Sequence, residues 1–322
     1  MTAAAARPDR VALGVATMVA TALAMSFGDA VVKLVSADFT VWQIYVARSA
    51  LAIPMIVALL AARRPRAVLP RALLPRALGW AVLRSFLLMA MWIAFYMALP
   101  LLSLSVVAAA YYTGPLFITL FGALLIGEPV GARRWCAIAI GFIGVLVILK
   151  PGGEAFDPLA LLPVVAAVFY AGAAIVTRAK LAEENPFALS LILNLAFLAV
   201  GVLATAGLAL WQPDVADGAA YRFMLGTWSA MGPREWAIMA LLAVLIVAIS
   251  SGVAKAYQCA PPAIIAAFDY SYLVFAALWS LAIFAEAPSM TTLSGMALIA
   301  GAGLLAIAPA TVWRRLRLGL RS

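Results

Sequence analysis

The residues of this sequence that could do chemistry are charged side chains placed inside long apolar segments. A charge at the middle of a bilayer costs about 2.5–3.5 kcal/mol on insertion scales, so such residues usually face the interior of a helix bundle or a cavity. Their expected depths divide them into two groups, and each group holds one carboxylate and two cations. The outer group is Asp29, Lys33 and Arg48, and the inner group is Arg84, Lys255 and Asp269.

These two groups predict gates at the two ends of a pore. Ion pairs can be remade between two conformations, so we expect the outer group to close one end and the inner group to close the other. Asp29 and Lys33 stand four residues apart and therefore share one helix face. The alternative for Lys33, Arg84 and Lys255 is that their long side chains reach the membrane surface from a nearby helix end.

A set of aromatic side chains is expected to line a central cavity. Trp92 and Tyr96 fall on one face of segment 77–98, and Gly114-Pro115 is expected to kink the next helix. A wide, weakly polar cavity would suit neutral, partly apolar solutes, whereas the alternative is that these rings pack in the core or face lipid. The expected lining residues are Trp92, Tyr96, Tyr111, Tyr112, Tyr170, Tyr257, Asp269, Tyr270 and Tyr272.

The composition identifies the elements that must hold these residues. The 322-residue chain is 67% hydrophobic and 11% charged, with a mean hydropathy of +1.10, which leaves too little polar surface for a water-soluble fold. Crossing about 30 Å of hydrocarbon takes roughly 20 helical residues. Ten apolar runs are therefore predicted to be transmembrane helices, at about 11–35, 40–62, 77–98, 101–126, 134–150, 158–179, 187–211, 235–256, 262–284 and 290–311.

The basic residues predict the orientation of these helices. Outside the apolar runs, all Lys and Arg residues fall on one side of the membrane except Lys150, Arg222 and Arg234. Because cytoplasmic loops carry the excess of positive charge, both chain ends are expected in the cytoplasm. The alternative, a signal peptide cleaved near Ala24, would expose arginine-rich segments outside. We expect a multi-pass protein of the plasma membrane, in bacteria the inner membrane.

An internal repeat divides the chain into two halves. Aligning Glu128 with Glu286 also places Tyr112 on Tyr270. The halves are expected at 11–150 and 158–311, with a cytoplasmic segment 1–10, an external linker 151–157 and a basic cytoplasmic tail 312–322. Each half holds five predicted helices, and because five is odd, the second half must be inverted, a plan typical of secondary transporters.

The ends of the fourth and ninth predicted helices carry a family resemblance. Residues 124–129 read Leu-Leu-Ile-Gly-Glu-Pro, residues 282–288 read Ala-Ile-Phe-Ala-Glu-Ala-Pro, and a glycine-rich helix follows each. In these features the chain resembles the drug/metabolite transporter superfamily in its ten-helix EamA branch, and within it YddG-type exporters of aromatic amino acids. The resemblance implies an all-α membrane fold of two inverted five-helix repeats around a central cavity. Glu128 and Glu286 themselves are expected to cap or turn helix ends at the membrane surface.

The leading hypothesis is a secondary transporter that exports neutral metabolites, with aromatic and other neutral amino acids as the substrates that the resemblance implies. One alternative is a broad drug or organic-cation exporter, in which Asp269 would be the counter-ion. The other is a channel or a non-transporting membrane scaffold. An enzyme is not expected, and neither is a nucleic-acid partner. The absence of histidine and the presence of only two cysteines give no reason to expect a metal or another cofactor, and the protein is expected to be a monomer or homodimer.

Overall fold

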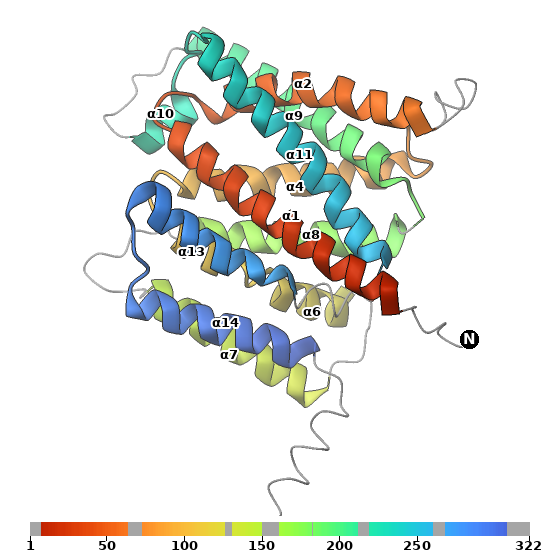
Figure 1. Cartoon of the computed structure of the whole chain (residues 1–322), viewed down its shortest axis with the longest axis vertical. Coiled ribbons are helices and arrows are strands. Elements are labelled where there is room, and N and C mark those ends of the chain that lie inside the picture. Colours follow the sequence, from red (N-terminus) through yellow and green to blue (C-terminus); the bar gives the residue numbers. More distant parts are fainter. Residues whose placement is uncertain are drawn as a thin grey trace, which may run out of the picture.

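The computed structural model describes residues 8–63, 73–125, 131–149, 161–181, 183–211, 219–259 and 268–307, and their regular structure is entirely helical (Figure 1). Six described helical segments are long and apolar enough to cross a membrane, counting residues 104–125 as one segment, and four shorter apolar helices accompany them. The prediction of an all-α integral membrane protein is therefore confirmed. The helices are α1 (Pro8–Val35), α2 (Val41–Arg63), α4 (Leu78–Ala98), α5 (Leu104–Tyr111), α6 (Gly114–Leu125), α7 (Ala132–Leu149), α8 (Leu162–Lys180), α9 (Pro186–Trp211), α10 (Ala219–Leu225), α11 (Pro233–Cys259), α13 (Ser271–Phe284) and α14 (Met290–Ile307).

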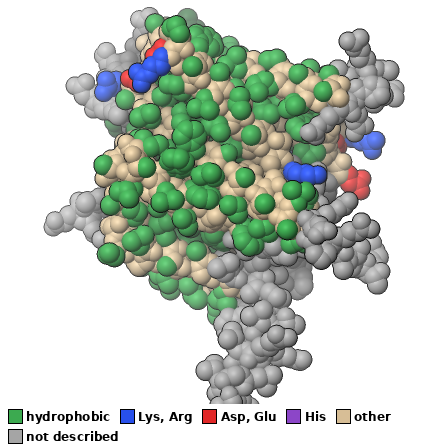
Figure 2. All heavy atoms as spheres, in the orientation of Figure 1, with side chains coloured by type: hydrophobic (Ala, Val, Ile, Leu, Met, Phe, Trp, Pro, Cys, Tyr) green, Lys and Arg blue, Asp and Glu red, His purple; other side chains and the backbone are tan. Residues whose placement is uncertain are grey.

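The outer surface of the bundle is apolar. Figure 2 shows hydrophobic side chains covering the visible face, with the few charged ones near its two lateral margins. Leu203 is 71% exposed and Leu210 is 88% exposed, although both lie in the middle or last turns of a long helix. Such a surface would be a liability in water, but it matches the hydrocarbon of a bilayer.

The helices of the two chain halves pack against each other. α2 packs on α9, and α7 packs on α14. α1, the first helix of the first half, packs on α11 and α13 of the second half. In the same way α8, the first helix of the second half, packs on α4, α5 and α6 of the first half. The pairing therefore stays the same when each helix of the first half is replaced by the corresponding helix of the second half.

Glycines let α7 and α14 approach closely. A methyl group added at Gly144 would lie 3.0 Å from the backbone oxygen of Gly295, and one added at Gly295 would lie 2.8 Å from that of Gly144. Small residues allow this kind of backbone contact between membrane helices. Gly144 and Gly295 therefore allow the close packing of α7 on α14.

The predicted kink at Gly114-Pro115 is a full interruption of the helix. α5 ends at Tyr111, the hydroxyl of Thr113 donates to the carbonyl oxygen of Ala110 over 2.7 Å, and α6 begins at Gly114. Proline has no N–H to donate to the preceding turn, so the backbone hydrogen-bond ladder must break here. The break puts Tyr112 between two helices, where its ring turns toward α13.

The turn after α13 contains a strained alanine. Ala285 has a φ of 54°, in the left-handed region that L-residues avoid at a cost of about 1–2 kcal/mol. Its N–H donates to the carbonyl oxygen of Leu281, and the N–H of Glu286 donates to that of Ser280. The first half has Gly127 at the equivalent position of the repeat alignment.

We predict that Ala285→Gly raises the free energy of unfolding by about 0.5–1 kcal/mol, because glycine removes the left-handed strain but loses part of that gain to its freer unfolded chain. Denaturation in mixed detergent micelles measures this change. The control is Ala277→Gly inside α13, which should destabilise by about 1 kcal/mol. A loss of stability in both variants would contradict the prediction.

Candidate functional site

Asp29 is buried where α1 meets α13. Its side chain accepts a hydrogen bond of 2.5 Å from the hydroxyl of Tyr272, and the two residues are 3% and 1% exposed. Asp29 lies in the last two turns of α1, and Tyr272 lies in the first turn of α13. The bond therefore joins a helix of the first half to a helix of the second half.

Asp269 has a matching partner. It lies just before α13 and accepts a 3.0 Å hydrogen bond from the hydroxyl of Tyr112, at the break between α5 and α6. Both residues are buried. Within the described residues, neither Asp29 nor Asp269 has a cation within ion-pair distance, so each carboxylate is bound by a neutral phenol.

The two tyrosines connect the two carboxylates. The rings of Tyr112 and Tyr272 stack with their centroids 5.0 Å apart and an angle of 25° between their planes. The order Asp29, Tyr272, Tyr112, Asp269 is thus one continuous series of side-chain contacts through the interior. We refer to these four residues as the carboxylate–tyrosine chain.

An arginine lies near each end of the carboxylate–tyrosine chain. Arg48 of α2 is within electrostatic range of Asp29, and Tyr96 lies near both. Arg84 of α4 donates from Nε to the hydroxyl of Thr177 over 2.9 Å. Tyr170 is within electrostatic range of Arg84 and of Asp269. Arg48 therefore lies near Asp29, whereas Arg84 and Asp269 share Tyr170 as a neighbour. That the two groups act as gates stays a prediction.

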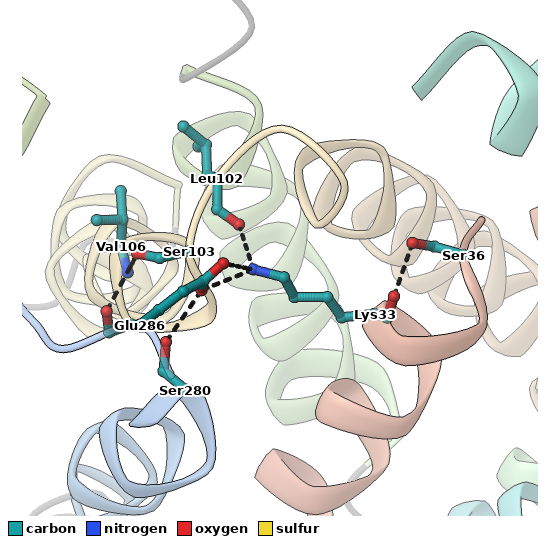
Figure 3. Close-up of polar contacts among 8 residues, drawn as sticks. Lys33, Ser36, Leu102, Ser103, Val106, Ser280 and Glu286 are labelled. Carbon is teal, nitrogen blue, oxygen red and sulfur yellow. Dashed lines mark hydrogen bonds and ion pairs between the residues drawn. The ribbon is translucent and has the colours of Figure 1, made fainter. Parts of the chain in front are cut away.

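Lys33 does not belong to the network of Asp29 and Arg48, so this part of the prediction is wrong. Its ammonium group binds both carboxylate oxygens of Glu286, at 2.8 and 3.0 Å, and the carbonyl oxygen of Leu102 at 3.0 Å (Figure 3). The long lysine side chain reaches past the helix end, whereas the short one of Asp29 stays at the level of Tyr272.

Glu286 has more than the predicted role at a helix end. Its backbone N–H does close the turn after α13, but its side chain also ties that turn to α1, and the hydroxyl of Ser280 donates to it over 3.3 Å. Lys33 belongs to the expected outer group, and the predicted orientation of the helices puts Glu286 at the same side of the membrane. That shared depth is the signal that could have identified the pair.

Lys255 is not part of an inner charge cluster. Its side chain is exposed on α11, and no described carboxylate lies within ion-pair distance of it. The prediction that it joins Arg84 and Asp269 is wrong for this conformation. The alternative stated for it, a side chain that reaches the membrane surface, agrees with its exposure.

The structure brings most of the expected cavity rings into contact. The ring centroids of Trp92 and Tyr96 lie 5.0 Å apart, and Phe95 connects both to Tyr111. Tyr111 in turn contacts Tyr112 and Tyr170, and Tyr112 contacts Tyr270 at 5.7 Å. The side chain of Tyr257 lies outside the described residues.

A small cavity lies beside Asp269, with room for about one water molecule. This cavity is too small for a metabolite in the described conformation, and the expected wide central cavity stays a prediction. Of the expected cavity residues, Trp92, Tyr96, Tyr270 and Tyr272 contact the ring network without lining this space. The lining residues are Met25, Tyr111, Tyr112, Gly114, Tyr170 and Asp269, of which Met25 and Gly114 were not expected.

The sequence is similar to those of known membrane transporters. The model of the EamA-like transporter family matches residues 12–150. A riboflavin transporter of Vibrio cholerae is 28% identical over 64% of this chain and 61% of the relative. An S-adenosylmethionine uptake transporter of Rickettsia bellii is 26% identical over 60% of each. The matches thus span less than two thirds of these relatives, and neither name refers to an amino-acid exporter.

A solved structure supports the fold over a longer range. The superposition with the crystal structure of another protein covers 96% of this chain and 99% of the other chain, with a TM-score of 0.61 and 18% sequence identity. At this identity the likeness concerns the arrangement of helices alone.

The carboxylate–tyrosine chain leads to a stability prediction. Tyr272→Phe should lower the free energy of unfolding by about 1–3 kcal/mol, because it removes the hydrogen bond that the Tyr272 hydroxyl donates to a buried carboxylate. The double variant Asp29→Leu/Tyr272→Phe should recover most of the loss, since both polar groups disappear together. Thermal unfolding in detergent measures both.

The matched control for this prediction is Tyr221→Phe, at a tyrosine that is 53% exposed, where no change is expected. A Tyr272→Phe variant as stable as Tyr221→Phe would show that the hydroxyl contributes nothing at Asp29.

Proposed function

We propose that this chain, whose residues 12–150 match the model of the EamA-like transporter family, is a secondary carrier that moves a small metabolite across the membrane by alternating access. The observation that carries the proposal is the carboxylate–tyrosine chain. It lies where helices of the two halves meet, and its four polar groups are buried without being ion-paired among the described residues. Polar groups in a membrane interior are costly and usually mark a solute or ion pathway.

In this proposal the halves 11–150 and 158–311 are inverted repeats with ten membrane spans. The exchange-symmetric helix pairing supports this arrangement. The distribution of Lys and Arg supports cytoplasmic chain ends and, for a bacterial protein, location in the inner membrane. The segments 1–7, 151–157 and 312–322 lie outside the described residues.

The outer end is closed by the contacts of Lys33. Its ammonium group links α1 to the turn after α13 and to the carbonyl oxygen of Leu102, which precedes α5. Opening this end toward the outside would require Lys33 to leave Glu286. At the inner end, Asp269 with Tyr112 and Arg84 with Thr177 form the contacts that must separate. The two closures are chemically unlike, since only the outer one contains an ion pair within the described residues.

The substrate class is a neutral or zwitterionic metabolite with a flat ring. The aromatic residues around the carboxylate–tyrosine chain could stack on such a ring once they separate. The family resemblance makes aromatic amino acids the first candidates for export. The names of the relatives add a second candidate, because riboflavin and S-adenosylmethionine both contain fused aromatic heterocycles.

Two other functions would use the same residues differently. An organic-cation exporter would use Asp269 as counter-ion, and Asp269→Asn would then abolish cation transport while sparing neutral solutes. A channel would conduct without saturation and without acceleration by solute on the opposite side.

Counterflow in proteoliposomes tests the proposal. Vesicles are loaded with unlabelled phenylalanine or riboflavin, and the entry of the corresponding labelled solute is followed. Saturable entry, several-fold faster into loaded than into unloaded vesicles, is expected for at least one of the two. Empty vesicles without protein are the control. Entry from correctly folded protein no faster than in this control, for both solutes, would contradict the proposal.

The outer closure gives a further prediction. Glu286→Gln removes an ion pair worth up to about 1 kcal/mol, which corresponds to roughly a fivefold shift between closed and open states. We therefore predict that a cysteine introduced at Ser26 reacts up to about fivefold faster with an impermeant maleimide added outside. Cys136 and Cys259 must first be replaced.

The charge-swapped pair Lys33→Glu/Glu286→Lys should return the labelling rate toward the original value. Lys255→Gln, which changes an exposed lysine, is the matched control and should leave it unchanged. Equal labelling in Glu286→Gln and the parent protein would exclude the ion pair as the outer closure.

A further inference from the structure

Arg48 is a buried arginine with two unused donors. It is 2% exposed in α2, and its Nε and Nη2 atoms have no hydrogen-bond partner among the described residues. Its guanidinium group lies over the rings of Phe197 and Tyr45, at 4.9 and 5.4 Å from their centroids. These rings stabilise the faces of the cation but leave the N–H groups at its edge unsatisfied, which is costly in a buried site.

The two unused atoms define the shape of the missing partner. Nε and Nη2 lie on one edge of the guanidinium plane and present two parallel N–H groups. A carboxylate accepts both at once, in the bidentate pairing for which arginine is best suited. Asp29 does not occupy this edge, because it accepts from Tyr272 and lies beyond ion-pair distance of Arg48.

Further unpaired polar atoms lie on α2 and α9, the two helices that carry Arg48 and the ring of Phe197. The hydroxyls of Tyr45 and Ser49 and the side-chain oxygen of Asn194 are also buried without a hydrogen-bond partner among the described residues. Asn194 donates its amide to the carbonyl oxygen of Ser190, so its free oxygen could accept an N–H from a ligand. It lies one turn before Phe197 on α9, on the helix that packs against α2.

Aromatic rings supply the apolar part of the same site. The ring of Tyr45 lies 4.7 Å from that of Phe197 and 6.1 Å from that of Tyr96, measured between centroids. An edge of N–H donors beside several aromatic rings fits a ligand with a carboxylate attached to an apolar or aromatic body.

We infer that the Nε–Nη2 edge of Arg48 binds the carboxylate of an acid with an apolar or aromatic body, with Asn194 accepting from a donor on the same molecule. The inference rests on the proposed function, because it names the substrate class of that carrier. It favours amino acids over riboflavin, which has no carboxylate.

The test uses the purified full chain in detergent, with benzoate as the probe and benzamide as its neutral counterpart. Benzoate should raise the melting temperature in a saturable manner, and benzamide should not. Arg48→Lys should raise the half-saturating benzoate concentration at least about tenfold, because an ammonium group cannot bind a carboxylate bidentately. Equal effects of benzoate and benzamide on the parent protein would overturn the inference.

A second variant separates a binding role from a structural one. Arg48→Met should raise the melting temperature of the ligand-free protein, because it removes an unsatisfied buried charge, and should abolish the benzoate effect. Lys255→Met, which removes an exposed cation, should keep it. A less stable or misfolded Arg48→Met protein, or one that still responds to benzoate, would show that Arg48 has another role.

The benzoate test measures binding and not transport, so its outcome and that of the counterflow test can differ. An Arg48-dependent response to benzoate without counterflow would reject the carrier and keep the anion site. Counterflow without such a response would reject the anion site and keep the carrier.

Discussion

A charged side chain inside a bilayer must find its partners within the protein, and this constraint governs the interior of this molecule. Asp29 and Asp269 are each satisfied by a phenol that comes from another helix, and the two phenol rings stack on each other. Such contacts require α1, α13 and the break between α5 and α6 to meet in the interior. The polar residues thus explain why helices of the two halves pack together, since aliphatic surface alone gains little by leaving lipid for protein.

The same constraint makes the two ends of the bundle different. Lys33 binds Glu286 at the end that we propose to be the outer one, whereas the contacts of Asp269 and Arg84 at the opposite end depend on tyrosine and threonine hydroxyls. Within the described residues, two donors of the buried Arg48 remain without a hydrogen-bond partner. The core of a stable soluble protein rarely contains a buried charged side chain with unsatisfied donors. A carrier can retain it, since its substrate supplies the missing partner, and binding energy can then favour one conformation over another.

The sequence predicts the parts of this structure that depend on local pattern. Apolar runs locate the helices, Gly114-Pro115 locates the break, and expected depth places Asp29 with Arg48. It does not predict that Lys33 binds Glu286, because the two are 253 residues apart and the reach of a lysine decides the partner. The exposure of Lys255 and the hydrogen bond of Tyr272 depend on helix rotation. An error of one residue turns a side chain by about 100°, which is enough to exchange lipid for interior.

The central claim is that the outer end of this protein opens and closes. Pulsed electron spin resonance between labels at Ala37 and Ala287, both exposed on either side of the Lys33–Glu286 pair, measures this directly in a lipid bilayer. Our account predicts two distance populations, with the longer one enriched when the ion pair is removed or when a transported solute is present outside. A single distance that neither treatment changes would contradict alternating access at this end.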